Sequence, residues 1–184
     1  MGFIRCHSDH TCFIHRQSQG RCIIISVYVD DIIITSDDAS GITQVKHDLG
    51  TSFDVKDLGP LRYFLGIEVA RSRQSIPLSQ RKHSLDLFQD TGMLGCRPAS
   101  SPMDPNLKLT TELGELLPDP LVYQRLVGYL IYLMNTRPNL TFAVSVVSQF
   151  MHSPRTYHLD AVYHILRYSR LVLVLGFLYS KSPA

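Results

Sequence analysis

Runs of apolar, mostly β-branched residues occupy much of the first 35 positions of the chain. Residues 11–16 and 21–29 are two such runs, and a polar stretch that ends in glycine separates them. A third run covers residues 32–35, directly after Asp30 and Asp31. Runs of this length bounded by turn residues are typical of strands. The pattern therefore predicts three strands joined by hairpin connections, with the acidic pair in a tight turn between the second and third.

A helical repeat follows the third strand. Asp37 and Asp38 are suited to cap a helix at its N-terminus, and apolar residues then recur at intervals of three and four. This apolar face consists of Ile42, Val45, Leu49 and Phe53. Further short strands are predicted at residues 53–58, 63–70 and 76–79. The order of elements favours an α+β fold with a sheet and helices over a parallel βαβ array.

The second half of the chain is predicted to be mainly helical. Residues 80–91 are a helix candidate with Gly92 as its C-terminal stop. Residues 96–120 hold five prolines and little periodicity, which indicates a long loop. Three further helices are predicted at residues 123–135, 139–151 and 158–168. The expected regions are 1–95 with the sheet, a Pro-rich linker loop over 96–120, and an all-helical region over 121–184.

The composition argues against several classes of protein. The 184 residues are 45% hydrophobic. Their net charge of only +2 is lower than the strongly positive charge expected of an autonomous nucleic-acid-binding module. The four cysteines show no C-x-x-C pairing and the eight histidines no ligand spacing, so we expect neither a zinc site nor a disulfide framework. Neither a secretory leader nor an apolar run of roughly 20 residues is present, so we expect an intracellular protein without a membrane partner.

The pair Asp30 and Asp31 carries the candidate chemistry. Adjacent carboxylates held on a rigid turn repel each other unless a cation offsets their charge, and Mg²⁺ prefers such oxygen ligands. Two such ions about 4 Å apart can stabilise the attacking and leaving oxygens of nucleotidyl transfer. Tyr28 precedes Asp30 by two residues on a strand, so we expect it on the same face, against a primer or template backbone. The alternative is ordinary turn chemistry without a metal.

Several motifs give the carboxylate pair a wider context. The run YVDDIIIT covers residues 28–35, FDVKDLG covers 53–59 and YFLGIEV covers 63–69. In this order they closely resemble the reverse transcriptases of copia-type long-terminal-repeat retrotransposons. Further segments that resemble the same family are residues 78–82, 91–93, 102–106, 123–128, 136–138, 142–145 and 151–154. The resemblance covers nearly the whole chain.

The resemblance implies an RNA-directed DNA polymerase. Residues 1–95 would be a partial right-hand palm, an antiparallel sheet with helices, and residues 121–184 an all-helical thumb and connection region. Asp30 and Asp31 would be the catalytic carboxylates, which bind Mg²⁺ in a two-metal site. The implied partners are an RNA or DNA primer-template and deoxynucleotides.

The resemblance also implies roles outside the acidic pair. The segment Leu65, Gly66 and Ile67 looks like the hairpin that grips the primer terminus. Together with Tyr28, this hairpin would contact the primer and template. Lys56 is a candidate for the lysine that assists pyrophosphate departure. Leu65 and Ile67 also fit plain strand residues with Gly66 as a bulge, and Lys56 also fits a solvated surface lysine.

The sequence departs from the family pattern in two places. The family palm has another metal-binding aspartate on an earlier strand, whereas Asp9 is the only acid before Tyr28 and does not match that motif. We therefore expect the two-metal site to be incomplete and the chain to be inactive alone. An apolar run at residues 171–174 replaces a glycine-containing turn. The alternative function is a non-catalytic remnant that binds nucleic acid, or another polypeptide through an exposed sheet edge.

Overall fold

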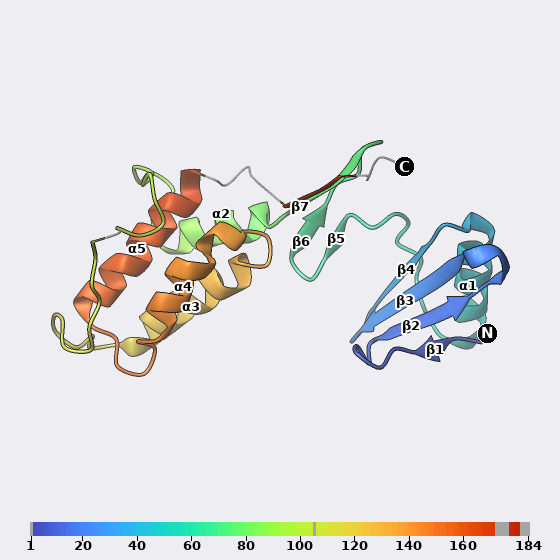
Figure 1. The fold of residues 1–184 in the computed structure, drawn as a ribbon, viewed down its shortest axis with the longest axis horizontal. Helices are drawn as coiled ribbons and strands as arrows, with labels where there is room; N and C mark the ends of the chain where they lie inside the picture. Colours follow the sequence, from blue (N-terminus) through green and yellow to red (C-terminus); the bar gives the residue numbers. More distant parts are fainter. Residues whose placement is uncertain (1, 105, 172–176, 181–184) are drawn as a thin grey trace. The chain divides into compact units, whose positions relative to one another are not determined.

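The computed structural model describes residues 2–104, 106–171 and 177–180. The chain forms two compact units, Met1–Leu61 and Arg62–Ala184 (Figure 1). Both units combine antiparallel strands with helices, so the expected α+β fold class is confirmed. The apolar run at 171–174 lies almost entirely outside the described residues. No helix in the described part of the chain is long and apolar enough to span a membrane.

Unit 1 is an antiparallel sheet with one helix. The strands lie in the order β1 (Ile4–Arg5), β2 (Cys12–Arg16), β3 (Cys22–Tyr28) and β4 (Asp31–Ser36). The three predicted strands are confirmed, and the short β1 was not predicted. A single 3-10 turn, η1 (Ser18–Gly20), connects β2 to β3 at the polar, glycine-ended stretch.

Helix α1 (Ala39–Ser52) supplies the other half of the unit 1 core. Its Val45 is buried with Ile23 and Ile25 of β3, and each fully buried side chain of this kind contributes about 1.5–3 kcal/mol. The carboxylate of Asp38 accepts a hydrogen bond from the Ser40 amide at 3.1 Å, which confirms the predicted N-cap.

Two predictions around residue 53 are wrong. Phe53 was placed on the apolar face of α1, but it ends the helix as its C-cap residue and is 62% exposed. The strand predicted at residues 53–58 is absent: this part of the chain has no regular structure, and every one of these side chains is exposed. A segment becomes a strand only where another strand lies alongside to bond its backbone, and none lies beside these residues.

Unit 2 begins with a second antiparallel sheet. Its strands lie in the order β5 (Tyr63–Phe64), β6 (Ile67–Val69), β7 (Ser75–Ser79) and β8 (Phe177–Ser180). The single strand predicted at 63–70 is instead a hairpin, because the chain reverses at Leu65 and Gly66. Strand β8 was not predicted, and it reaches β7 from the far end of the sequence (Figure 1).

The predicted helices of unit 2 are confirmed. They are α2 (Arg81–Asp90), α3 (Pro120–Leu133), α4 (Thr141–Ser148), which continues the 3-10 turn η2 (Pro138–Leu140), and α5 (Thr156–Leu171). Their buried faces form one core, in which Phe88 of α2 and Tyr123 of α3 are the largest fully buried side chains. Gly92 has φ of 66° and ends α2 as predicted, since the next amide, of Met93, bonds back to the Phe88 carbonyl.

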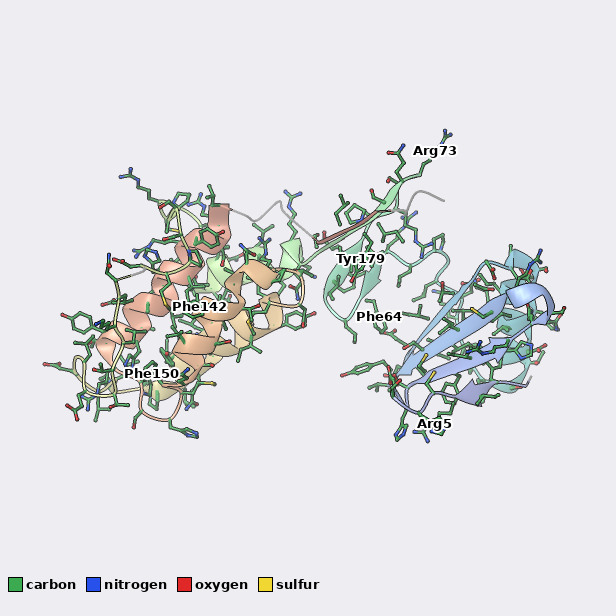
Figure 2. The ribbon with its side chains drawn as sticks, viewed as in Figure 1. Arg5, Phe64, Arg73, Phe142, Phe150 and Tyr179 are labelled. Atoms are coloured by element: carbon green, nitrogen blue, oxygen red, sulfur yellow. The ribbon has the colours of Figure 1, made fainter. Side chains whose placement is uncertain are left out.

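The Pro-rich segment 96–120 is fastened to α5. Arg155 donates hydrogen bonds to the Thr111 and Gly114 carbonyls, both at 2.7 Å. His158 is fully buried, bonds the Thr110 carbonyl at 2.9 Å and stacks on Phe150, which Figure 2 labels. The segment has no helix or strand before α3 in its described part. The division at 95 and 120 stays a prediction, but the loop is held by specific polar contacts.

Candidate active site

The candidate carboxylates lie at the turn between β3 and β4. Tyr28 pairs with Asp31 at the end of the ladder, so Val29 and Asp30 alone form the turn. The sequence placed both aspartates in the turn, but Asp31 is the first residue of β4. Val29 has φ of 50°, and it takes the position where a type II′ turn usually has glycine. A β-branched residue in this region is strained by about 1–3 kcal/mol.

The register decides which side chains share a face at this turn. Residues directly opposite each other in an antiparallel pair point to the same face, so Tyr28 shares its face with Asp31. The expected alignment of Tyr28 with Asp30 by strand alternation does not apply, because Asp30 has left the strand. Tyr28 is 49% exposed, and both carboxylates are exposed.

Both carboxylates are available to an outside ligand. No described residue makes a hydrogen bond or ion pair with the side chain of Asp30 or Asp31. Carboxylate oxygens presented from a rigid hairpin are the donor set that a hard divalent cation takes. The residues present therefore fit a metal ion, which would offset the repulsion between the two charges.

A third protein ligand is missing from the neighbourhood that the structure describes. No group of three or more His, Cys, Asp or Glu side chains that could hold a metal occurs among the described residues. Asp9 lies in the loop between β1 and β2, where its carboxylate accepts hydrogen bonds from the Thr11 hydroxyl at 2.7 Å and the Thr11 amide at 2.9 Å. These hydrogen bonds lower the pKa of Asp9. Asp9 is thus engaged within its own loop.

Lys56 lies on the segment between α1 and β5. Its side chain is exposed and makes no hydrogen bond or ion pair with any described residue. The neighbouring Asp57 instead bonds Lys46 of α1 at 3.0 Å and accepts the Gly59 amide at 2.9 Å. The Gly59 amide and then the Lys46 ammonium lower the pKa of Asp57. Asp57 therefore attaches this segment to α1, and Lys56 takes no part in the attachment.

The hairpin of β5 and β6 is the second predicted site. Phe64 pairs with Ile67, and the two residues between them, Leu65 and Gly66, have φ of 47° and 78°. Positive φ at both central residues defines a type I′ turn, so Gly66 is a turn residue and not a bulge. Val29 and Leu65 are the two non-glycine residues with positive φ in the described chain, and each begins one of the two candidate turns.

Tyr132 of α3 holds this second turn, a contact that no pattern in the sequence predicted. Its hydroxyl donates a hydrogen bond to the Leu65 carbonyl. The ring of His83 packs edge-on against Tyr132 at 4.7 Å, and burial lowers the pKa of His83. Gln80 is fully buried, donates to the Tyr132 carbonyl at 3.1 Å and accepts from the Thr136 hydroxyl at 2.7 Å. The turn is therefore connected to the rigid helical core.

An α+β chain with two exposed carboxylates at a hairpin turn is consistent with part of a polymerase palm. The family described as "Reverse transcriptase (RNA-dependent DNA polymerase)" matches residues 1–105, and the chain belongs to this family. More narrowly, most of the chain is similar to the Pol polyproteins of copia-type retrotransposons.

The retrotransposon polyproteins that the chain matches are much longer than the chain itself. The chain is 44% identical over 91% of its length to the Retrovirus-related Pol polyprotein from transposon RE2 of Arabidopsis thaliana, of which it covers 12%. It is 37% identical over 91% of its length to the corresponding polyprotein from transposon TNT 1-94 of Nicotiana tabacum, of which it covers 13%. It also matches the uncharacterized mitochondrial protein AtMg00810 of Arabidopsis thaliana, at 36% identity over 85% of this chain and 65% of that protein. No solved structure matches the chain.

Proposed function

We propose that Asp30 and Asp31 are metal-binding carboxylates of an RNA-directed DNA polymerase site, with Mg²⁺ as the ion. The observation that carries this proposal is the pair of exposed carboxylates without protein partners at the β3–β4 turn, in a chain of the reverse transcriptase family. Reverse transcriptases use divalent metal ions and bind a nucleic-acid template. Bound ions supply electrostatic stabilisation of the attacking 3′-oxygen and the departing pyrophosphate.

The remaining site residues position the substrates. Tyr28, on the face of Asp31, contacts the primer or template backbone beside the metal ligands. The turn of Leu65, Gly66 and Ile67 grips the primer terminus, supported by its link to the helical core. Lys56 donates a proton to the departing pyrophosphate or stabilises its negative charge. Residues 1–95 act as the palm segment and residues 121–184 as the thumb and connection segment, with 96–120 between them.

We further propose that the 184-residue polypeptide does not polymerise DNA by itself. A site for two metal ions would need more protein ligands than these two carboxylates supply. The described residues bring only two carboxylates to the turn. An activity would therefore require a third carboxylate from another segment or polypeptide.

Metal binding is the direct test of the carboxylate pair. Mn²⁺ is a paramagnetic substitute for Mg²⁺, and its binding to the purified chain can be followed by electron paramagnetic resonance. We expect a weak site that the double substitution Asp30→Asn and Asp31→Asn removes. Asp37→Asn is the matched control, because Asp37 is an exposed aspartate of an adjacent Asp-Asp pair. Equal binding in the double variant would refute the metal assignment.

Primer extension tests the activity separately. The chain is mixed with a primed RNA template, Mg²⁺ and deoxynucleotides, and we expect no elongation above background. Robust synthesis that Asp30→Asn abolishes would overturn the inactivity but support the metal site. Salt-sensitive binding of the primer-template without any Mn²⁺ site would favour the non-catalytic binding function instead.

A further inference from the structure

Two of the four cysteines face each other at the edge of unit 1. In the ladder of β1 and β2, Arg5 lies opposite Phe13, and the next step of that register sets Cys6 opposite Cys12. The Cys6 amide donates to the Cys12 carbonyl at 2.9 Å, so the ladder extends to this pair. Opposite residues of an antiparallel pair point to the same face of the sheet, so the two thiols lie side by side on one face.

The backbone geometry at this pair suits a disulfide. Opposite residues of an antiparallel ladder have Cα atoms about 4.5–5.5 Å apart, within the range of roughly 4.4–6.8 Å that disulfides span. Both cysteines are free and partly exposed, so a small oxidant can reach them. The neighbouring Cys6 thiol is the largest of the effects that raise the pKa of the Cys12 thiol.

The loop that this pair closes lies beside the candidate active site. It runs from Cys6 to Cys12, and its Thr11 carbonyl accepts a hydrogen bond from the Val27 amide of β3 at 2.9 Å. The loop between β1 and β2 and the turn between β3 and β4 lie at the same end of the sheet (Figure 1), where Figure 2 labels Arg5.

We propose that Cys6 and Cys12 form a dithiol site for a low-molecular-weight disulfide such as glutathione disulfide, and that they close to a reversible intramolecular disulfide. One protein thiolate attacks a sulfur of the oxidant and displaces one glutathione thiolate, which takes up a proton. The second protein thiolate then attacks the mixed disulfide and displaces the other glutathione. Two protein thiols lose two electrons and two protons, and the oxidant becomes two thiols.

The remaining cysteines provide an internal comparison. Cys22 lies opposite Arg16 in the ladder, and Cys96 lies in the segment after α2. Each is partly exposed, like the proposed pair, but no thiol of the described residues lies opposite either one. A glutathione adduct on Cys22 or Cys96 therefore has no adjacent thiol to displace it.

Intact mass spectrometry of the full chain in a glutathione redox buffer tests the proposal. We expect a species lighter by two hydrogens, which dithiothreitol restores to the parent mass, and peptide mapping should join Cys6 to Cys12. The Cys22→Ser, Cys96→Ser double variant should behave like the parent. Cys6→Ser or Cys12→Ser should instead stop at a mixed disulfide, with the mass of one glutathione added.

Three outcomes would overturn the proposal. They are stable glutathione adducts on both Cys6 and Cys12 without an internal disulfide, internal pairing that involves Cys22 or Cys96, and covalent dimers as the main oxidised product. The mapping of the parent chain decides among these outcomes without any substituted protein, so a variant that fails to fold does not affect the result.

Discussion

Replacement of Gly66 by alanine tests how the β5–β6 turn is held. Gly66 has φ of 78°, and a Cβ at this position would collide with the hydroxyl of Tyr132. A residue with a Cβ in the left-handed region costs about 1–2 kcal/mol. Displacement of Tyr132 also removes its hydrogen bond to the Leu65 carbonyl, worth about 1 kcal/mol. We therefore expect Gly66→Ala to lower the free energy of unfolding of unit 2 by about 2–3 kcal/mol.

Two further variants separate backbone strain from the collision. Gly128→Ala in α3 is the matched control, because nothing lies within 4 Å of its added Cβ and alanine favours a helix by about 1 kcal/mol. Tyr132→Phe keeps the ring but removes the colliding hydroxyl. We expect the Gly66→Ala, Tyr132→Phe double variant to lose about 1 kcal/mol less free energy of unfolding than the two single variants lose together.

Urea denaturation followed by circular dichroism measures these free energies. The comparison holds if the dependence of the free energy on urea is the same in all variants. Two results would refute the reasoning. One is a loss below about 0.5 kcal/mol for Gly66→Ala, the size of an ordinary surface change. The other is additivity of the two substitutions within about 0.3 kcal/mol.

Three more predictions concern the contacts that fix the loops and the first helix. His158→Leu leaves the Thr110 carbonyl and the Arg155 amide without their hydrogen bonds to a buried ring. We therefore expect a loss of about 2–4 kcal/mol in the free energy of unfolding, measured by urea denaturation. An unchanged value would contradict this. Asp38→Ala should lower the melting temperature of unit 1, while Asp37→Ala should not. Hydrogen bonds, chiefly from Ser40, hold the pKa of Asp38 below its ordinary 3.8. The Asp38 carboxylate therefore contributes to the free energy of unfolding above that pH, and this contribution is lost as the pH falls through the lower, folded-state pKa. Equal acid unfolding of Asp38→Asn and the parent would contradict this. Arg155→Met removes two hydrogen bonds to the Pro-rich segment, and limited trypsin digestion should then cut that segment faster than in the parent chain.

Local patterns in the sequence determined most of the regular elements. The N-cap at Asp38 and the stop at Gly92 depend on contacts within one helical turn, and both are confirmed. The Pro-rich composition of 96–120 correctly excluded regular structure from its described part. The acidic pair and its flanking motifs were also sufficient to identify the reverse transcriptase family. The catalytic roles of Asp30 and Asp31 stay predictions, since side-chain chemistry alone does not show a bound metal.

Only the tertiary structure decided which segments meet. Residues 53–58 were predicted to be a strand but have no partner strand, whereas β7 pairs with β8, about a hundred residues later. The contact of Tyr132 with Leu65 and the alignment of Cys6 with Cys12 likewise follow from strand register and helix packing. Such pairings depend on backbone hydrogen bonds and burial between distant segments. For the candidate turn, the sequence supplied the two carboxylates, and the register placed Asp30 in the turn and Asp31 across from Tyr28.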